Sequence, residues 1–132
     1  MKGIYTALLT YIDEETGYDV AVPDIPGCVT TGKDLASAIC AIVDAANGCL
    51  CVLEDEGLPL PEPSAPQDIP LEAGAITTLI QVDTDTYRIR TQSQAVRKSV
   101  SMPKWMADMA DRKGINCSQL LQQALRQRFE LP

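Results

Sequence analysis

The sequence predicts an α+β protein that consists of an acidic N-terminal domain and a small basic C-terminal module. Over the first two thirds of the chain, β-forming segments and one amphipathic segment follow in the order strand, strand, strand, helix, strand. Charge then divides the chain. Residues 1–86 carry fifteen acidic and two basic residues (net −13), and residues 87–132 carry nine basic and three acidic residues (net +6). Such a division indicates two modules with oppositely charged partners.

The first three strands lie before residue 32. Ile4–Ile12 is rich in β-branched and aromatic residues, and Tyr18–Val22 is a second segment of this kind. Residues 13–17 (DEETG) between them are typical of a tight turn, so we expect a hairpin. The loop Pro23–Gly27, stiffened by two prolines, then leads to a short third strand at Cys28–Thr31.

The fourth element is an amphipathic helix. Gly32 ends the third strand, and Asp34 is placed to cap a helix that begins at the next residue. Apolar residues then recur at spacings of three and four and form one stripe suited to covering a sheet: Leu35, Ile39, Ile42, Ala46, Leu50 and Leu53. The acidic residues 54–56 and Gly57 end the helix. Because their charge opposes the helix dipole, we expect this end to fray or to bind a partner.

A proline-rich connection and one more strand complete the N-terminal domain. Five prolines between Leu58 and Pro70 exclude a helix or a central strand there and predict an extended connection. The segment 75–82 (AITTLIQV) is the last strand, so one helix covers one sheet. We place this domain at residues 1–82, a polar linker at residues 83–95 and the basic module at residues 96–132.

The basic module is predicted to contain a strand, a helix, a turn and a second helix. Pro103 begins the first helix, which runs through Arg112, and Gly114 ends it. The second helix runs from Asn116 to Phe129. Strand 97–102 alternates, with apolar side chains on one face and Arg97, Ser99 and Ser101 on the other. A module this small does not fold alone, so we expect a partner chain.

Pairing of two copies through this strand would create a DNA-binding surface. An antiparallel pair presents two sets of Arg97, Ser99 and Ser101, and a two-stranded ribbon fits the major groove, where arginine reads guanine. Asn116 is placed to cap the second helix, which leaves the backbone N–H groups of Cys117 and Ser118 to bind a DNA phosphate. The alternative is a dimerisation tail whose charges are only solvated.

Composition argues against metal, cofactor and membrane roles. The chain has no histidine, and its five cysteines show no C-x-x-C spacing, so neither a zinc site nor a disulfide framework is expected. Without histidine the commonest general base is missing, and no catalytic residue, metal or cofactor is predicted. No apolar run approaches the ~20 residues that cross a bilayer. The N-terminus shows no signal pattern, so we expect a cytoplasmic protein that does not bind membranes.

The basic module resembles the ribbon-helix-helix repressors, in a version found among bacterial antitoxins. The resemblance covers residues 96–129 and rests on residues 101–106 (SMPKWM) and 114–125 (GINCSQLLQQAL). It implies that Arg97, Ser99 and Ser101 face the groove and that Ser118 meets a phosphate. Lys98 occupies an inward strand position that is usually apolar in the family, and we expect it to reach a phosphate instead. The implied interlocked dimer core comprises Met102, Trp105 or Met106, Met109, Leu120, Leu121 and Leu125.

The N-terminal domain resembles the HicB antitoxin family. Residues 17–32 (GYDVAVPDIPGCVTTG), a helix and residues 57–63 (GLPLPEP) follow in the family's order, and the resemblance covers residues 4–82. Lys33 and Ser37 depart from the family, in which acidic residues are usual at these positions. The implied fold is a partial ribonuclease H-like domain, but a nuclease needs several carboxylates that converge from adjacent strands. We therefore expect no enzyme and interpret Asp24 as a cap of its own turn.

The resemblance implies an antitoxin that neutralises HicA, a small toxin that cleaves messenger RNA, and represses its own operon through operator DNA. A toxin that holds RNA must be basic, which suits an acidic partner. We expect a homodimer through the C-terminal module, or a tetramer of such dimers. Two alternatives stay open: a stand-alone regulator with an N-terminal ligand-sensing domain, and acidity that serves only solubility. The acidic residues predicted to contact the toxin are Asp13, Glu14 and Glu15 in the turn and Glu54, Asp55 and Glu56 at the helix end.

Overall fold

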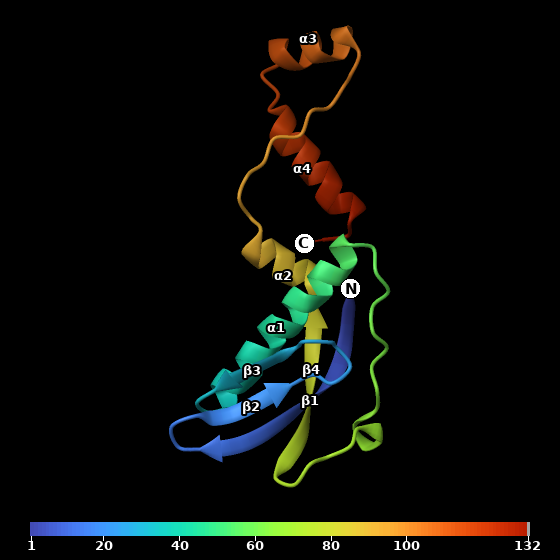
Figure 1. Ribbon diagram of the computed structural model, residues 1–132. Coiled ribbons are helices and arrows are strands. Elements are labelled where there is room, and N and C mark those ends of the chain that lie inside the picture. Colours follow the sequence, from blue (N-terminus) through green and yellow to red (C-terminus); the bar gives the residue numbers. More distant parts are fainter. Residues whose placement is uncertain (132) are drawn as a thin grey trace. The chain divides into compact units, whose positions relative to one another are not determined.

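The structure is a computed structural model that describes residues Met1–Leu131, and it divides into two compact units (Figure 1). Unit 1 is Met1–Gln94 and unit 2 is Ala95–Pro132. Pro132, which the prediction included in the basic module, lies outside the described residues. The division comes twelve residues later than the predicted end of the N-terminal domain at residue 82, because a further helix belongs to unit 1.

Unit 1 contains a four-stranded antiparallel sheet in the order β3-β2-β1-β4. The central strand β1 is twelve residues long and pairs with β2 on one side and β4 on the other. The predicted strands are confirmed, with ends that differ by at most two residues. They are β1 (Lys2–Asp13), β2 (Gly17–Ala21), β3 (Val29–Gly32) and β4 (Ala75–Asp83).

Helix α1 (Leu35–Asp55) covers one face of this sheet. The Asp34 carboxylate accepts a hydrogen bond from the Ser37 N–H at 2.7 Å, which confirms the predicted cap. Four residues at a spacing of four are buried against the sheet: Ala38, Ile42, Ala46 and Leu50. Leu35, which the prediction placed in this stripe, is 49% exposed and lines a surface hollow with Tyr11 and Tyr18 instead.

Length and composition alone would allow α1 to cross a membrane. The expectation that no segment approaches this length was therefore wrong, because the apolar character of α1 extends beyond its sheet-facing stripe. In the structure Ile42 and Leu50 pack in the core formed with β1, β2 and β4. A helix that covers the core of a folded domain can have the same length and apolar composition as a membrane-spanning helix.

Gly32 brings β3 and α1 into very close contact. A Cβ atom added to Gly32 would lie 2.3 Å from the backbone nitrogen of Ala38 and 2.5 Å from its Cα. We expect Gly32→Ala to destabilise unit 1 by about 3 kcal/mol, since overpacking costs roughly 1–3 kcal/mol or more. Urea unfolding followed by circular dichroism measures this. The control is Gly27→Ala, at a positive φ of 74° with open space around it, where about 1 kcal/mol is expected. Equal losses for both variants would contradict the close contact.

The proline-rich connection is fastened to the sheet by hydrogen bonds. The Tyr5 hydroxyl donates to the Pro61 carbonyl at 2.6 Å, and the N–H and hydroxyl of Ser64 both donate to the Asp24 carboxylate at 2.7 Å. The prediction that Asp24 caps its own turn was therefore wrong. The turn is closed by backbone bonds such as Ile25 N–H to Val22 C=O, and the carboxylate serves a residue forty positions away. A 3₁₀ turn, η1 (Pro66–Asp68), interrupts the extended course.

Residues 83–95 were predicted as a linker, but most of them form helix α2 (Thr84–Thr91). Its N-cap is Asp83, whose carboxylate accepts from the Thr86 N–H at 3.0 Å. Arg88 joins α2 to the end of α1, with its Nη2 atom 3.0 Å from an Asp55 oxygen and 3.4 Å from a Glu54 oxygen. The prediction was wrong because this polar segment gains its helix from contacts with residues more than thirty positions earlier.

Unit 2 has an extended segment, residues 95–103, followed by α3 (Lys104–Arg112) and α4 (Cys117–Arg128). Both predicted helices are confirmed. The Asn116 side chain accepts from the Gln119 N–H at 3.1 Å, as a cap should. The predicted strand 97–102 is not assigned as a strand, because no segment of the described chain pairs with it. A strand exists only with a hydrogen-bonding partner.

Candidate protein-binding and DNA-binding surfaces

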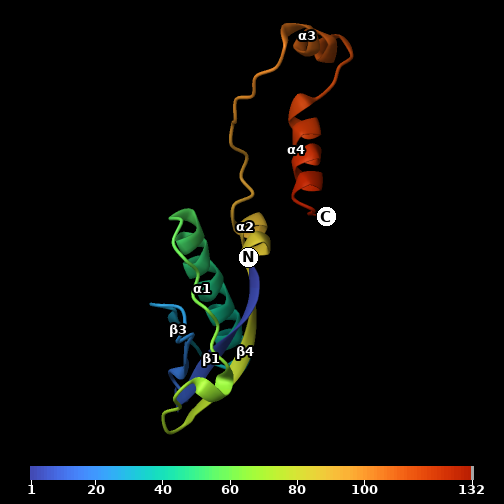
Figure 2. The ribbon, with the colours of Figure 1, turned by 90° about the vertical axis from the view of Figure 1, so that its right-hand side faces the viewer.

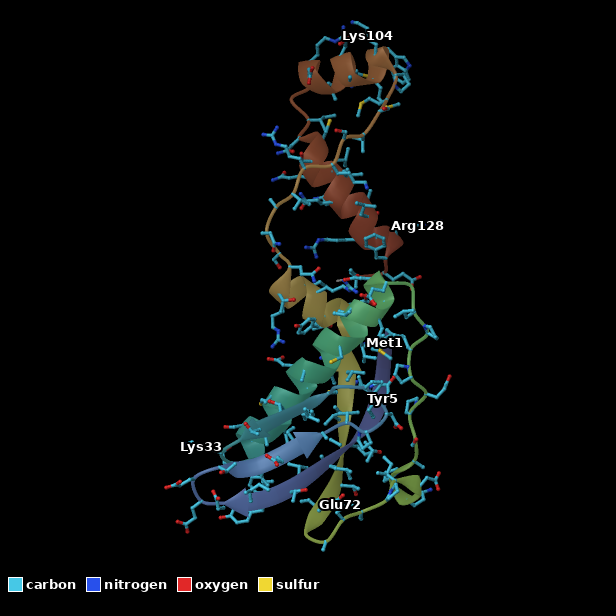
Figure 3. All side chains as sticks on the ribbon, viewed as in Figure 1. Met1, Tyr5, Lys33, Glu72, Lys104 and Arg128 are labelled. Atoms are coloured by element: carbon cyan, nitrogen blue, oxygen red, sulfur yellow. The ribbon has the colours of Figure 1, made fainter. Side chains whose placement is uncertain are left out.

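The two acidic clusters predicted to contact a toxin lie at opposite ends of unit 1. Asp13 ends β1 and residues 14–15 lie in the turn that follows, whereas residues 54–56 end α1 near Met1, at the start of the same strand. Met1 and Lys33 mark these two ends in Figure 3. Twelve residues of strand separate them, roughly 40 Å at about 3.3 Å per residue. The structure therefore does not bring the six acidic residues into one site.

The helix-end cluster is engaged within unit 1. The amine of Met1 lies 3.3 Å from a Glu54 oxygen, and Arg88 pairs with both Glu54 and Asp55. Burial opposes ionisation of Glu54, but hydrogen bonds from Thr84, the Met1 amine and Arg88 outweigh it, so the pKa of Glu54 is lowered. Because these cations offset the charge locally, the cluster attracts a partner less strongly than its composition indicates.

The turn cluster is more open. Asp13, Glu14 and Glu15 are all exposed. The Asp13 carboxylate accepts from the backbone N–H of Thr16 at 2.6 Å, which stabilises its charged form and lowers the pKa of Asp13. This bond fixes the turn and leaves Glu14 and Glu15 facing solvent. Charge at this end is thus available to a partner.

The lowered pKa of Glu54 predicts a pH-dependent attachment of α2. Its folded pKa lies below the ordinary value of 4.5, so its stabilising contribution is present above about pH 4.5 and lost as the pH falls through the folded pKa. Glu54→Gln is expected to lower the thermal midpoint by roughly 3 °C at pH 7. The difference in thermal midpoint between the variant and the wild-type chain should disappear as the pH falls toward about 3. The control is Glu56→Gln. A difference that persists unchanged in acid would contradict the assignment.

Unit 2 leaves its apolar side chains unburied. No residue between 95 and 131 is buried. The extended segment, α3 and α4 enclose a hollow of about 520 Å³ whose lining includes Met102, Met106, Met109, Leu120 and Leu121. These five belong to the predicted dimer core, and Met106 rather than Trp105 lines the hollow. Trp105 is 61% exposed.

The predicted DNA-contact residues lie on two elements of unit 2. Arg97, Lys98, Ser99 and Ser101 are exposed along the extended segment, and Ser118 is exposed on the first turn of α4. Asn116 has a different role, because its side chain is used to cap α4. It therefore supports the helix terminus, whose first N–H groups precede the first intrahelical bond.

Neither a metal centre nor a thiol centre is evident in the part of the chain that the structure describes. No group of three or more His, Cys, Asp or Glu residues within Met1–Leu131 could hold a metal ion. The five cysteines are free thiols. Burial, and then the neighbouring Cys49, raise the pKa of Cys28 to about 11, so this thiol is protonated at neutral pH. Cys28 and Cys51 are buried and thus act as small apolar side chains.

Unit 1 is thus a sheet covered by α1 with an exposed acidic turn, and unit 2 is basic with an unburied apolar side. Residues 5–124 match the family described as "HicB_like antitoxin of bacterial toxin-antitoxin system". The chain belongs to this family of antitoxins. A comparison with the curated proteins gives no match.

Solved structures share the mixed α+β fold. A chain of the toxin–antitoxin complex from Streptococcus pneumoniae has a TM-score of 0.63 and 22% identity, covering 97% of this chain and 99% of that one. The antitoxin HicB of Burkholderia pseudomallei has a TM-score of 0.55 and 24% identity, covering 93% and 96%. A chain of the HicA3 and HicB3 toxin–antitoxin complex is 31% identical with a TM-score of 0.52, covering 61% and 99%.

Proposed function

We propose that this chain neutralises a HicA-type, messenger-RNA-cleaving toxin through unit 1 and represses its own operon through unit 2. The observation that carries the proposal is the family match over residues 5–124. The identity of 31% with a chain of a complex described as HicA3 and HicB3 supports a HicA-type partner. The net charge of −13 over residues 1–86 favours a basic, RNA-holding toxin, because complementary charge speeds encounter.

Unit 1 then acts as a binding domain of partial ribonuclease H-like type. The order of elements from β1 to β4, β-β-β-α-β, supports this assignment. Hydrolysis by two metal ions would need carboxylates that converge from adjacent strands. Asp24, the carboxylate of the proline-locked loop, is bound to Ser64, and Asp13 holds a turn at the end of β1. Neither residue is arranged as nuclease chemistry requires.

Unit 2 then acts as a ribbon-helix-helix dimer. The unburied apolar hollow supports pairing, because a second copy would cover Met106, Met109 and Leu120. Pairing also provides a hydrogen-bonding partner for residues 97–102, which would form an antiparallel ribbon. The ribbon would place Arg97, Ser99 and Ser101 of both copies against base edges, while Lys98 and the start of α4 at Ser118 would meet phosphates.

Co-expression tests the proposal. A HicA-type toxin encoded next to this chain is expected to arrest growth when expressed alone, and co-expression of the full chain is expected to restore growth. The purified complex should also shift DNA taken from upstream of the chain's own coding sequence. A chain that shifts this DNA but neither binds nor neutralises a toxin would instead be a stand-alone regulator.

A further inference from the structure

One face of the sheet in unit 1 carries no α-helix, and we call it the open face. The proline-rich connection covers it only in part, at Thr6, whose hydroxyl donates to the Ser64 carbonyl at 3.3 Å. Tyr5, Ala7 and Leu9 of β1 point into the core under α1, so the alternate residues point the other way. The register pairs Leu8 with Ala21 and Thr10 with Asp19, which places these four side chains together on the open face. Figure 2 shows α1 on one side of β1 and β4.

A groove of about 450 Å³ lies on the open face. Its floor includes Leu8 and Ala21, and Val29 of β3 lies beside them because it pairs with Ala21. Glu72, labelled in Figure 3, contributes from the connection that precedes β4. The groove is thus built from three strands and a connection that unit 1 holds in place, rather than from one mobile loop.

Large aliphatic side chains on this face are open to solvent. Val29 is 70% exposed, Leu79 of β4 is 58% exposed and Ile4 of β1 is 56% exposed. The register shows that all three share the face, since Leu79 pairs with Thr6 and Val29 pairs with Ala21. Val29 lines the groove, whereas Ile4 and Leu79 lie beyond Thr6, which is buried and donates to the Ser64 carbonyl at 3.3 Å. Exposed aliphatic side chains on one sheet face, one of them in a groove, favour a binding surface.

The charge around the groove selects the kind of partner. Asp19 and Glu72 line it, and none of its lining residues is basic. Lys2, at the end of β1, points to the same face but lies 3.7 Å from Asp83. Unit 1 as a whole has fifteen acidic and four basic residues, a net charge of −11. Such a field attracts a basic protein and repels a second copy of this unit.

We propose that the open face is the docking surface for the basic toxin. A toxin side chain of aliphatic or aromatic character fills the groove against Leu8 and Val29, and its lysine or arginine residues pair with Asp19 and Glu72. This inference rests on the proposed function and locates the contact within unit 1. It assigns contact to the sheet and not to the helix-end cluster, residues 54–56, whose charges are largely used inside the unit.

Two charge-introducing variants test the docking surface in the full-length chain. Val29→Arg puts a cation at the groove, and Asp19→Arg reverses a charge at its rim. Each variant is expected to weaken toxin binding at least about 100-fold, because a positive charge that faces a basic partner costs several kcal/mol. Controls are Leu58→Arg, at an exposed aliphatic residue outside the groove lining, and Glu56→Arg, the same charge change at the helix end. Circular dichroism and operator binding report on folding. The probe is a catalytically inactive form of the HicA-type toxin encoded beside the chain, and titration calorimetry measures affinity.

The outcomes separate this inference from the proposed function. Weakened binding for Val29→Arg and Asp19→Arg, with both controls unchanged, supports the open face. Normal toxin binding by these two variants overturns the docking proposal but leaves the antitoxin function intact. A loss of toxin binding that is confined to Glu56→Arg has the same meaning. A change in oligomeric mass with unchanged toxin affinity assigns the face to copy–copy contact and also overturns it. Failure of the wild-type chain to bind the toxin contradicts the proposed function itself.

Discussion

Replacing Leu120 by aspartate is expected to abolish operator binding by preventing two copies of unit 2 from pairing. Leu120 lines the apolar hollow and is 55% exposed in the single chain, so the monomer tolerates a charge there. In the proposed dimer the same position is covered, and a buried unpaired carboxylate costs at least about 4 kcal/mol, about a thousandfold in the dimer dissociation constant. Light scattering with size-exclusion chromatography and a mobility-shift assay measure the two effects.

A matched change on the same helix isolates the cause. Gln122→Asp introduces the same charge at an exposed residue of α4 outside the hollow, so it should leave the dimer and the shifted DNA band unchanged. Toxin binding by unit 1 should survive in both variants. A Leu120→Asp protein that stays dimeric at micromolar concentration and binds operator DNA normally would show that the hollow is not the dimer core.

The features predicted correctly from sequence are those set by neighbouring residues. Asp34 and Asn116 were expected to cap helices, and each accepts a hydrogen bond from the N–H three residues later. The β1–β2 hairpin follows from β-forming segments around the turn at residues 13–17. Such signals are local because a cap or a tight turn involves only a few consecutive residues.

The features that were missed depend on residues far apart in the chain. Asp24 bonds Ser64 forty positions away, and Arg88 reaches Glu54 and Asp55 to hold a helix whose own composition is polar. Nothing within residues 83–95 reveals these partners. The separation of the two acidic clusters has the same origin, since the ion pair between the Met1 amine and Glu54 places residues 54–56 at the start of β1, opposite the turn at its end.

The two candidate sites also differ in whether neighbouring residues or distant residues define them. The alternation of residues 97–102 identifies a basic, hydroxyl-bearing face from sequence, because side chains alternate in any extended segment. The open face could not be predicted from sequence alternation, because Asp19, Val29 and Leu79 come from three different strands and share a face only through the strand register. The aliphatic character of Val29 and Leu79 alone would equally suit a core.

Removing Arg97 and Ser99 together, as Arg97→Ala with Ser99→Ala, is expected to abolish operator recognition while leaving dimerisation and toxin binding intact. Each good arginine–guanine contact contributes about 1–3 kcal/mol, and a dimer supplies two, so we expect a loss of about 4 kcal/mol or roughly a thousandfold. A mobility-shift assay on the upstream DNA measures it. The control, Arg90→Ala with Ser93→Ala, removes the same residue types from unit 1, where Arg90 pairs with Asp44.

The salt dependence of binding distinguishes a base contact from a phosphate contact. If Arg97 reads a base, its loss should lower affinity for the operator far more than for unrelated DNA, with little change in the salt slope. Lys98→Ala should do the opposite: it should weaken binding to all sequences about equally and reduce the slope by about one per protomer, because each phosphate contact releases a counterion. Unchanged operator affinity of the Arg97 and Ser99 double variant would remove the ribbon from the DNA interface and leave the start of α4 at Ser118 as its remaining candidate.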